Sequence, residues 1–185
     1  MKGKLVFILL LFGIDSYSQK TAINNAALKT TDGKDFKIDP VANTASVIVF
    51  LLPDCPASQN YTLSLNQFSE KYAANKVAFY GVFPAFVKKD EIVEFQKEYH
   101  IKFPLLMDDK QSLTNALHAH VAPGVFVLDQ RGTVVYSGRI DDWMYAVGKK
   151  RTVITHHELQ DALDAIVQGK KVVISKTQAV GCIID

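Results

Sequence analysis

The sequence is short of cysteine, of net charge and of long apolar runs. Its 185 residues include only two cysteines, and 21 basic residues nearly balance 19 acidic ones for a net charge of +2. Two cysteines are far too few for a disulfide-stapled miniprotein, and so weak a charge does not predict a nucleic-acid partner. With 48% hydrophobic residues, the chain is nonetheless apolar enough to fold around one core. The two cysteines therefore need an explanation other than stapling the fold.

The first 18 residues have the pattern of a cleavable secretory signal peptide. Lys2 and Lys4 precede an apolar run over residues 5–14, and Ser16 and Ser18 lie where a signal peptidase would cut. The apolar run is well short of the roughly 20 residues that a membrane-spanning helix needs. We therefore predict an exported protein, periplasmic or secreted, that is not embedded in the membrane after cleavage. Export would place its thiols in an oxidising compartment.

Strand-like and helix-like segments alternate along the rest of the chain. The run at 46–52 is continuously apolar and β-branched, as expected of a strand buried on both faces. Further strands are expected at 26–31, 36–38, 76–84, 104–107, 124–129 and 133–137, and helices at 56–74, 90–99, 110–118 and 156–167. We predict one α/β domain over residues 19–169, with a central mixed sheet flanked by helices on both faces. A tail over residues 170–185 follows it.

Cys55 directly follows the most apolar strand and directly precedes the first long helix. Reactive groups collect at the carboxyl ends of strands in α/β sheets. Pro56 suits the first helical turn, which would place Cys55 near the N-cap. The N–H groups and dipole of a helix start stabilise a thiolate and lower the pKa of the thiol. This favours a reactive cysteine over the alternative, a small buried side chain at the end of a strand.

Two segments, FLLPDCPAS at residues 50–58 and VAPGVFVLDQRG at residues 121–132, together resemble the thioredoxin-like superfamily. They are most similar to its redoxin branch, which includes alkyl hydroperoxide reductase/thiol-specific antioxidant proteins and exported thiol–disulfide oxidoreductases. The resemblance covers residues 26–168 and implies a thioredoxin-like fold with Cys55 as the active cysteine. It also implies that the peptide bond before Pro123 is cis and that this proline faces the cysteine. The alternative is a trans proline at the first residue of a strand.

Three positions depart from the patterns of this superfamily. Ser58 replaces the second cysteine of the thioredoxin C-x-x-C, so a disulfide within the helix start cannot form. Its hydroxyl is expected either to donate a hydrogen bond to a Cys55 thiolate or to be solvated in the first turn. Leu52 replaces the Thr or Ser that helps peroxiredoxins bind peroxide, which argues against efficient peroxidase activity. Gln59 replaces the second cysteine of the copper-chaperone relatives, so their usual metal site is not present.

Cys182 lies in the tail that follows the last expected helix. An even number of cysteines in an exported chain favours pairing, and a tail folded over the strand ends would bring Cys182 to Cys55. The Gly-Cys-x-Ile ending resembles that of an exported redoxin subgroup, as does the Gly-Arg-Ile-Asp segment at residues 138–141. Three alternatives remain open: a resolving cysteine in thiol–disulfide exchange, a structural disulfide, or no pairing.

Two further features follow the expected hairpin. Arg139 is either a group that stabilises the thiolate and polarises a substrate oxygen or one half of a surface ion pair with Asp141. Thr155 and Glu158 match a capping box at the start of the last helix. We expect the side chain of each of these two residues to accept a hydrogen bond from the backbone N–H of the other.

Together these features predict an exported thioredoxin-like thiol–disulfide oxidoreductase. Cys55 would be the nucleophile, Cys182 the resolving cysteine, and Pro123, Ser58 and Arg139 would shape or tune the site. We expect a protein thiol or disulfide, or a peroxide, as partner and neither an organic cofactor nor a metal, because no closed set of ligands appears. The alternatives are a peroxiredoxin-like thiol peroxidase with antioxidant activity and a non-catalytic copper-binding or interaction protein. Nothing predicts an oligomeric state.

Overall fold

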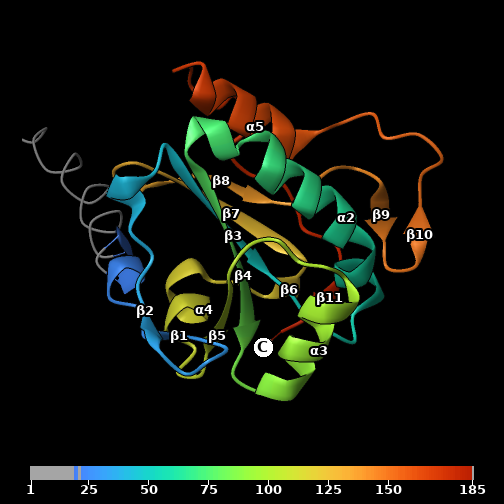
Figure 1. Ribbon diagram of the computed structural model, residues 1–185. Coiled ribbons are helices and arrows are strands. Elements are labelled where there is room, and N and C mark those ends of the chain that lie inside the picture. The colour runs from blue at the N-terminus through green and yellow to red at the C-terminus, as the bar shows by residue number, and fades with distance from the viewer. Residues whose placement is uncertain (1–18, 21, 185) are drawn as a thin grey trace, which may run out of the picture.

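A seven-stranded mixed sheet forms the centre of the molecule in the computed structural model, which describes residues 19–20 and 22–184 (Figure 1). The predicted signal peptide lies outside these residues. The strand order is β2-β1-β5-β4-β3-β7-β8. These strands are β1 (Leu28–Thr30), β2 (Asp35–Phe36), β3 (Ala45–Phe50), β4 (Val77–Pro84), β5 (Leu105–Asp108), β7 (Gly124–Asp129) and β8 (Val134–Gly138). The α/β class with a mixed sheet is thereby confirmed.

Strand β3 lies inside the sheet, and all six of its residues are buried. It pairs in parallel with β4 and antiparallel with β7, while β4 pairs in parallel with β5. A strand covered on both faces needs apolar side chains at every position, which explains its continuous apolar sequence. The loop that follows β3 consequently leaves the sheet from its middle rather than from its edge.

Helices cover both faces of the sheet (Figure 1). Helix α2 (Pro56–Lys71) lies between α3 (Lys89–Glu98) and α5 (Glu158–Val167) on one face. The side chain of Asn66 in α2 donates to the carbonyls of Tyr99 and His100, which follow α3. The hydroxyl of Tyr72, which follows α2, donates to the carboxylate of Asp164 in α5. Helix α4 lies on the opposite face. The helices are α2 (Pro56–Lys71), α3 (Lys89–Glu98), α4 (Ser112–Leu117) and α5 (Glu158–Val167), with short 3-10 turns η1 (Pro40–Ala42) and η2 (Ala73–Asn75).

The start of α5 differs from the prediction. The helix begins at Glu158, and its N-cap, His157, makes no side-chain capping bond. The Thr155 hydroxyl instead donates to the carboxylate of Asp142 at 2.5 Å, and Glu158 forms an ion pair with Arg139. The predicted capping box is therefore wrong, because both of its side chains bind the segment that follows β8.

The segments outside the central sheet also carry short strands. β9 (Met144–Ala146) and β10 (Lys149–Lys150) pair antiparallel within the stretch after β8. The tail packs on the domain, where its β11 (Cys182–Ile183) pairs antiparallel with β6 (Val121–Ala122). No helix within the described part of the chain is both long and apolar enough to cross a membrane.

Candidate redox site

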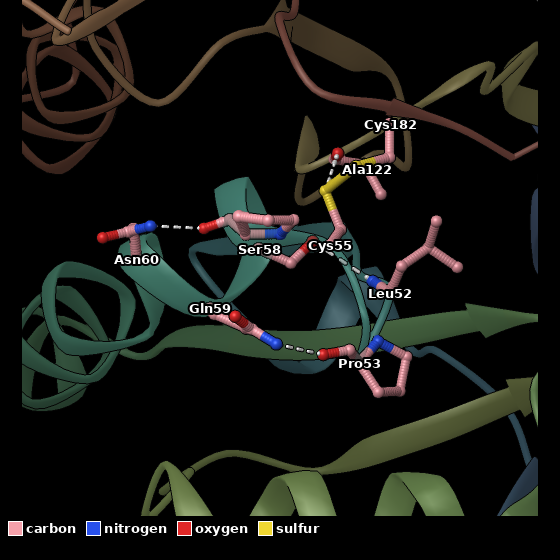
Figure 2. The surroundings of a disulfide bond; sticks show 9 residues. Leu52, Pro53, Cys55, Ser58, Gln59, Asn60, Ala122 and Cys182 are labelled. Atoms are coloured by element: carbon pink, nitrogen blue, oxygen red, sulfur yellow. Dashed lines mark hydrogen bonds between the residues drawn. A yellow bond between two sulfur atoms is a disulfide. The ribbon is translucent and has the colours of Figure 1, made fainter. Parts of the chain in front are cut away.

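The end of β3 and the start of α2 fix the position of Cys55. Its backbone is extended and forms the N-cap of α2, with Pro56 in the first turn, as the sequence predicts. The side chain is only 1% exposed. Its sulfur is bonded to that of Cys182, and the two Cα atoms lie 6.1 Å apart (Figure 2). The two cysteines, 127 positions apart in the sequence, therefore form one disulfide.

The turn between β6 and β7 forms one wall of this site. The Ala122–Pro123 peptide bond is cis, which is the conformation that the resemblance implies. The carbonyl oxygen of Ala122 lies 3.4 Å from the sulfur of Cys55 (Figure 2). After reduction, the Cys55 thiol would have a hydrogen-bond acceptor at this position.

Main-chain contacts hold Cys182 against the same turn. Cys182 pairs with Ala122 across the β11–β6 ladder, and the Ile184 N–H donates to the carbonyl of His120 at 3.1 Å. At Gly181 the two backbones come so close that an added Cβ would lie 2.0 Å from the Ala122 carbonyl oxygen. Only glycine permits this approach, so the sequence before Cys182 is adapted to seat the tail.

A second anchor holds the tail beside β8. The Thr177 N–H donates to the Ser137 carbonyl at 2.9 Å, and the Ser137 N–H donates to the Ser175 carbonyl at 3.0 Å. The Thr177 hydroxyl lies 2.8 Å from the Tyr136 hydroxyl and accepts from the Arg139 N–H at 3.1 Å. The tail is thus bound at two separate places before and after residues 178–181.

Ser58 is not solvated in the first turn of α2, whereas its hydrogen bond to a Cys55 thiolate remains a prediction for the reduced protein. The Ser58 side chain is fully buried. Its hydroxyl oxygen accepts a hydrogen bond from the Leu52 N–H at 3.2 Å (Figure 2). The neighbouring Gln59 side chain donates to the Pro53 carbonyl at 2.7 Å. Both side chains therefore hold the loop between β3 and α2 in place around Cys55.

Arg139 is not paired with Asp141, so that expectation is wrong. Its Nε donates to Glu158 Oε1 at 2.8 Å, and a terminal nitrogen bonds the same oxygen. Glu158 is buried, with 4% of its surface exposed. The hydrogen bonds that Arg139 donates to Glu158 raise the pKa of Arg139. The guanidinium therefore joins α5 to the end of β8, next to the Thr177 anchor.

A polar network at the start of the β9–β10 segment was not predicted. The Tyr61 hydroxyl donates to Asp141 at 2.5 Å, and Asp141 also accepts from the Trp143 N–H at 2.9 Å. Burial, followed by the bond to Asp141, raises the pKa of Tyr61. The hydrogen bond from Thr155 lowers the pKa of Asp142. Two adjacent acidic residues before the only tryptophan were a signal in the sequence, but their partners come from distant segments.

A copper-binding protein, one of the alternatives, would need a cluster of metal ligands. Within residues 19–20 and 22–184, no three His, Cys, Asp or Glu side chains are arranged to hold a metal ion. Both sulfurs, the softest candidate ligands, are bonded to each other. The oxidised site is therefore a disulfide centre.

A disulfide that joins a buried cysteine at a strand-to-helix junction to the tail, on a mixed sheet with helices on both faces, defines a protein of the thioredoxin-like class. The redoxin family model matches residues 18–143, and the chain belongs to this family. Membership of this family supports an oxidoreductase acting on thiol or peroxide substrates. No curated protein matches the chain.

Solved structures show the same fold. A hypothetical protein from Sinorhizobium meliloti is 27% identical, with a TM-score of 0.76, over 85% of this chain and 88% of its own. A secreted disulfide oxidoreductase of Mycobacterium tuberculosis, homologous to E. coli DsbE, is 19% identical with a TM-score of 0.57, over 80% and 98%. The bacterioferritin comigratory protein of Xanthomonas campestris, described with alkyl peroxide reduction activity, is 17% identical with a TM-score of 0.56, over 80% and 92%.

Proposed function

We propose that this protein is an exported thiol–disulfide oxidoreductase with Cys55 as the nucleophile and Cys182 as the resolving cysteine. The observation that supports it best is the position of the Cys55–Cys182 disulfide, at the N-terminus of α2 and beside a cis proline. A helix N-terminus stabilises the thiolate form that exchange chemistry requires. Membership of the redoxin family supports the same chemistry.

The reaction takes place in two exchange steps. The Cys55 thiolate attacks one sulfur of a partner disulfide, so a mixed disulfide forms and the partner's other sulfur leaves as a thiolate. The Cys182 thiolate then attacks Cys55 Sγ, which closes the Cys55–Cys182 disulfide and releases the second partner thiolate. The partner gains two electrons and the protein loses two. The same steps in reverse oxidise a partner dithiol.

Three residues would position this chemistry without reacting. Pro123 holds the turn whose preceding carbonyl lies beside Cys55 Sγ. Ser58 fixes the loop before α2 through the Leu52 N–H. Arg139, bound to Glu158, holds the end of β8 where the tail is anchored. Each acts on the position of a sulfur rather than on the substrate.

The proposal includes export to the periplasm or beyond the cell. Residues 1–18 carry the pattern of a signal peptide. Disulfides persist in oxidising compartments and are rare in the cytosol, and the Cys55–Cys182 bond suits such a compartment. Expression of the full chain, followed by cell fractionation and N-terminal sequencing of the product, tests this part. Recovery of the unprocessed chain in the cytosol would refute it.

Thiol trapping during turnover tests the chemistry. The pre-reduced protein should reduce glutathione disulfide and end as the Cys55–Cys182 disulfide by intact mass. Cys55→Ser should abolish this reaction, whereas Cys182→Ser and Cys182→Ala should both stop at a mixed disulfide on Cys55. A disulfide that dithiothreitol reduces only after the protein is unfolded would identify a structural bond and refute the proposal.

A thiol peroxidase is the second candidate function. A Cys55 sulfenic acid that condensed with the Cys182 thiol would leave the observed disulfide, and the likeness to the Xanthomonas protein agrees with it. Against it, the buried side chain three residues before Cys55 is Leu52, which has no hydroxyl to bind peroxide. We expect peroxide consumption by the reduced protein to be much slower than disulfide exchange. Rapid consumption that is lost in Cys55→Ser would reverse this order.

A further inference from the structure

The two sulfurs of the disulfide are unequally accessible to a reducing thiolate. Cys55 is 1% exposed, whereas Cys182 is partly exposed and its neighbour Ile183 is 72% exposed. A thiolate attacks a disulfide along the line of the S–S bond, from the side opposite the sulfur that leaves. In the view of Figure 2, the extension of the S–S bond beyond Cys55 runs toward Ser58 of α2, which is fully buried. For attack on Cys182 the line leads away from α2.

The leaving group favours the same direction. Exchange is faster when the sulfur that departs is the more stable thiolate. Cys55 departs into the N-cap of α2, where helix N–H groups and the dipole stabilise negative charge. Cys182 lies in the two-residue strand β11 and has no helix start of its own. Access and leaving-group stability therefore select the same sulfur for attack.

We propose that electrons enter the oxidised protein at Cys182. The thiolate of a reducing dithiol bonds to Cys182 Sγ, the Cys182–Cys55 bond breaks, and Cys55 leaves as the thiolate. The second thiol of the reductant then attacks the reductant's first sulfur, which is bonded to Cys182, and releases Cys182 as a thiolate. The reductant becomes a disulfide, and the protein gains two electrons. This inference rests on the proposed function and extends it: the substrate reacts at Cys55, and the reductant reacts at Cys182.

The seating of the tail keeps the attacked sulfur in place. The pairing of Cys182 with Ala122 and the close approach at Gly181 are main-chain contacts that do not depend on the disulfide. They therefore hold Cys182, the partly exposed half of the disulfide, in place in the oxidised protein that the reductant attacks. Because the substrate reacts at Cys55 and the reductant at Cys182, the two partners do not compete for one sulfur.

Glutathione is the probe for the first test. The oxidised wild-type protein is mixed with a limiting amount, quenched at early times with N-ethylmaleimide, and mapped by peptide mass spectrometry. The amounts of the two labelled species are extrapolated to zero time. We expect the species with glutathione on Cys182 and maleimide on Cys55 to be in roughly tenfold excess over the species with the two labels exchanged. Equal amounts, or an excess of glutathione on Cys55, would overturn the inference and leave the proposed function intact. No adduct, together with no reduction of glutathione disulfide, would overturn both.

Charge beside Cys182 gives a second, independent test. Ile183→Glu should slow the reaction with the anionic thiolate of glutathione, and Ile183→Lys should speed it, each by roughly threefold at low salt. Neither change should alter the rate at which the reduced protein attacks an uncharged model disulfide through Cys55. Ile174, which is half exposed in the same tail, provides matched Glu and Lys controls with no expected effect. Equal effects at positions 174 and 183, or none at 183, would contradict entry at Cys182.

Discussion

The two halves of the disulfide are held in different ways. Cys55 is fixed by the domain core: it follows the fully buried strand β3, caps α2 and lies on a loop bound by Ser58. Cys182 is fixed by contacts of a tail that lies outside the central sheet: the backbone ladder with β6, and the backbone and side-chain bonds of the Thr177 anchor. Displacing Cys55 therefore requires unfolding of the domain, whereas displacing Cys182 requires only that the docked tail segment be released.

This difference suits a resolving cysteine. Opening of a segment held by few backbone bonds costs much less free energy than global unfolding. After reduction, residues 178–184 are free to leave β6 and expose the buried Cys55, while the anchor at Thr177 keeps the tail attached. The nucleophile stays preorganised, and its cover is what moves. Substitutions can therefore perturb one half of the disulfide at a time.

The largest effect is expected from Gly181→Val, which acts on the tail alone. A side chain at this position would overlap the Ala122 carbonyl, so β11 cannot seat and the disulfide loses its geometry. We expect at least roughly a tenfold shift of the thiol–disulfide equilibrium toward the reduced form in a glutathione redox buffer. The urea stability of the reduced protein should change by less than about 1 kcal/mol.

The exposed tail residue Lys171 provides the control for this change. Lys171→Val adds the same β-branched side chain to the tail, but far from β6, and should leave the redox equilibrium unchanged. If Gly181→Val kept the wild-type equilibrium, the contact between Gly181 and Ala122 would not be what seats Cys182.

The core half of the site was predictable from the sequence, because local patterns encode it. The apolar run ending at residue 52 and the proline after Cys55 define a strand, a loop and a helix start in consecutive residues. The position of Cys55 follows from these neighbours alone. The cis bond before Pro123 was implied by the family resemblance, because no local pattern distinguishes it from a trans bond.

The tail half was only partly predictable, because its contacts join distant segments. The glycine before Cys182 is visible in the sequence, but the need for it comes from the Ala122 carbonyl, some 60 positions away. Arg139 pairs with Glu158, which had been assigned to a capping box, and not with Asp141. Short-range motifs compete with long-range ion pairs for the same side chains, and the buried long-range pair prevailed here.

An intermediate effect, on the core half, is expected from Ser58→Ala. The change removes the acceptor of the Leu52 N–H in a fully buried position. An unsatisfied buried donor costs about 1–3 kcal/mol, and we expect this loss in the urea-induced unfolding of both the oxidised and the reduced protein. The redox equilibrium should shift less than in Gly181→Val, because β11 remains seated.

Ser69→Ala is the matched control in the same helix, since the Ser69 hydroxyl bonds within α2 at a partly exposed position. It should cost less than half as much as Ser58→Ala. Equal losses for the two serines would show that the hydroxyl of Ser58 has no special role in holding the Cys55 loop.

The smallest effect is expected at Tyr136, whose hydroxyl joins the core to the Thr177 anchor. Burial raises the pKa of Tyr136 to about 12, above the value of about 10 for an unfolded tyrosine. The protonated phenol therefore stabilises the native state fully below pH 10, and this contribution is lost as the pH rises from 10 to 12. Tyr136→Phe should cost about 1 kcal/mol at pH 7 and should lack this alkaline loss.

Urea unfolding of the wild type and Tyr136→Phe between pH 8 and pH 12 measures the difference. Subtracting the variant removes the contribution of the other buried tyrosines, and Tyr145→Phe, at a half-exposed position on β9, is the control for aromatic substitution. The two stability curves should approach each other as the pH rises above about 10 and should cross before about pH 12, because the loss over this range exceeds the difference of about 1 kcal/mol at pH 7. Parallel curves throughout would mean that the Tyr136 hydroxyl does not hold the tail anchor, and that the Thr177 contacts to the main chain are sufficient.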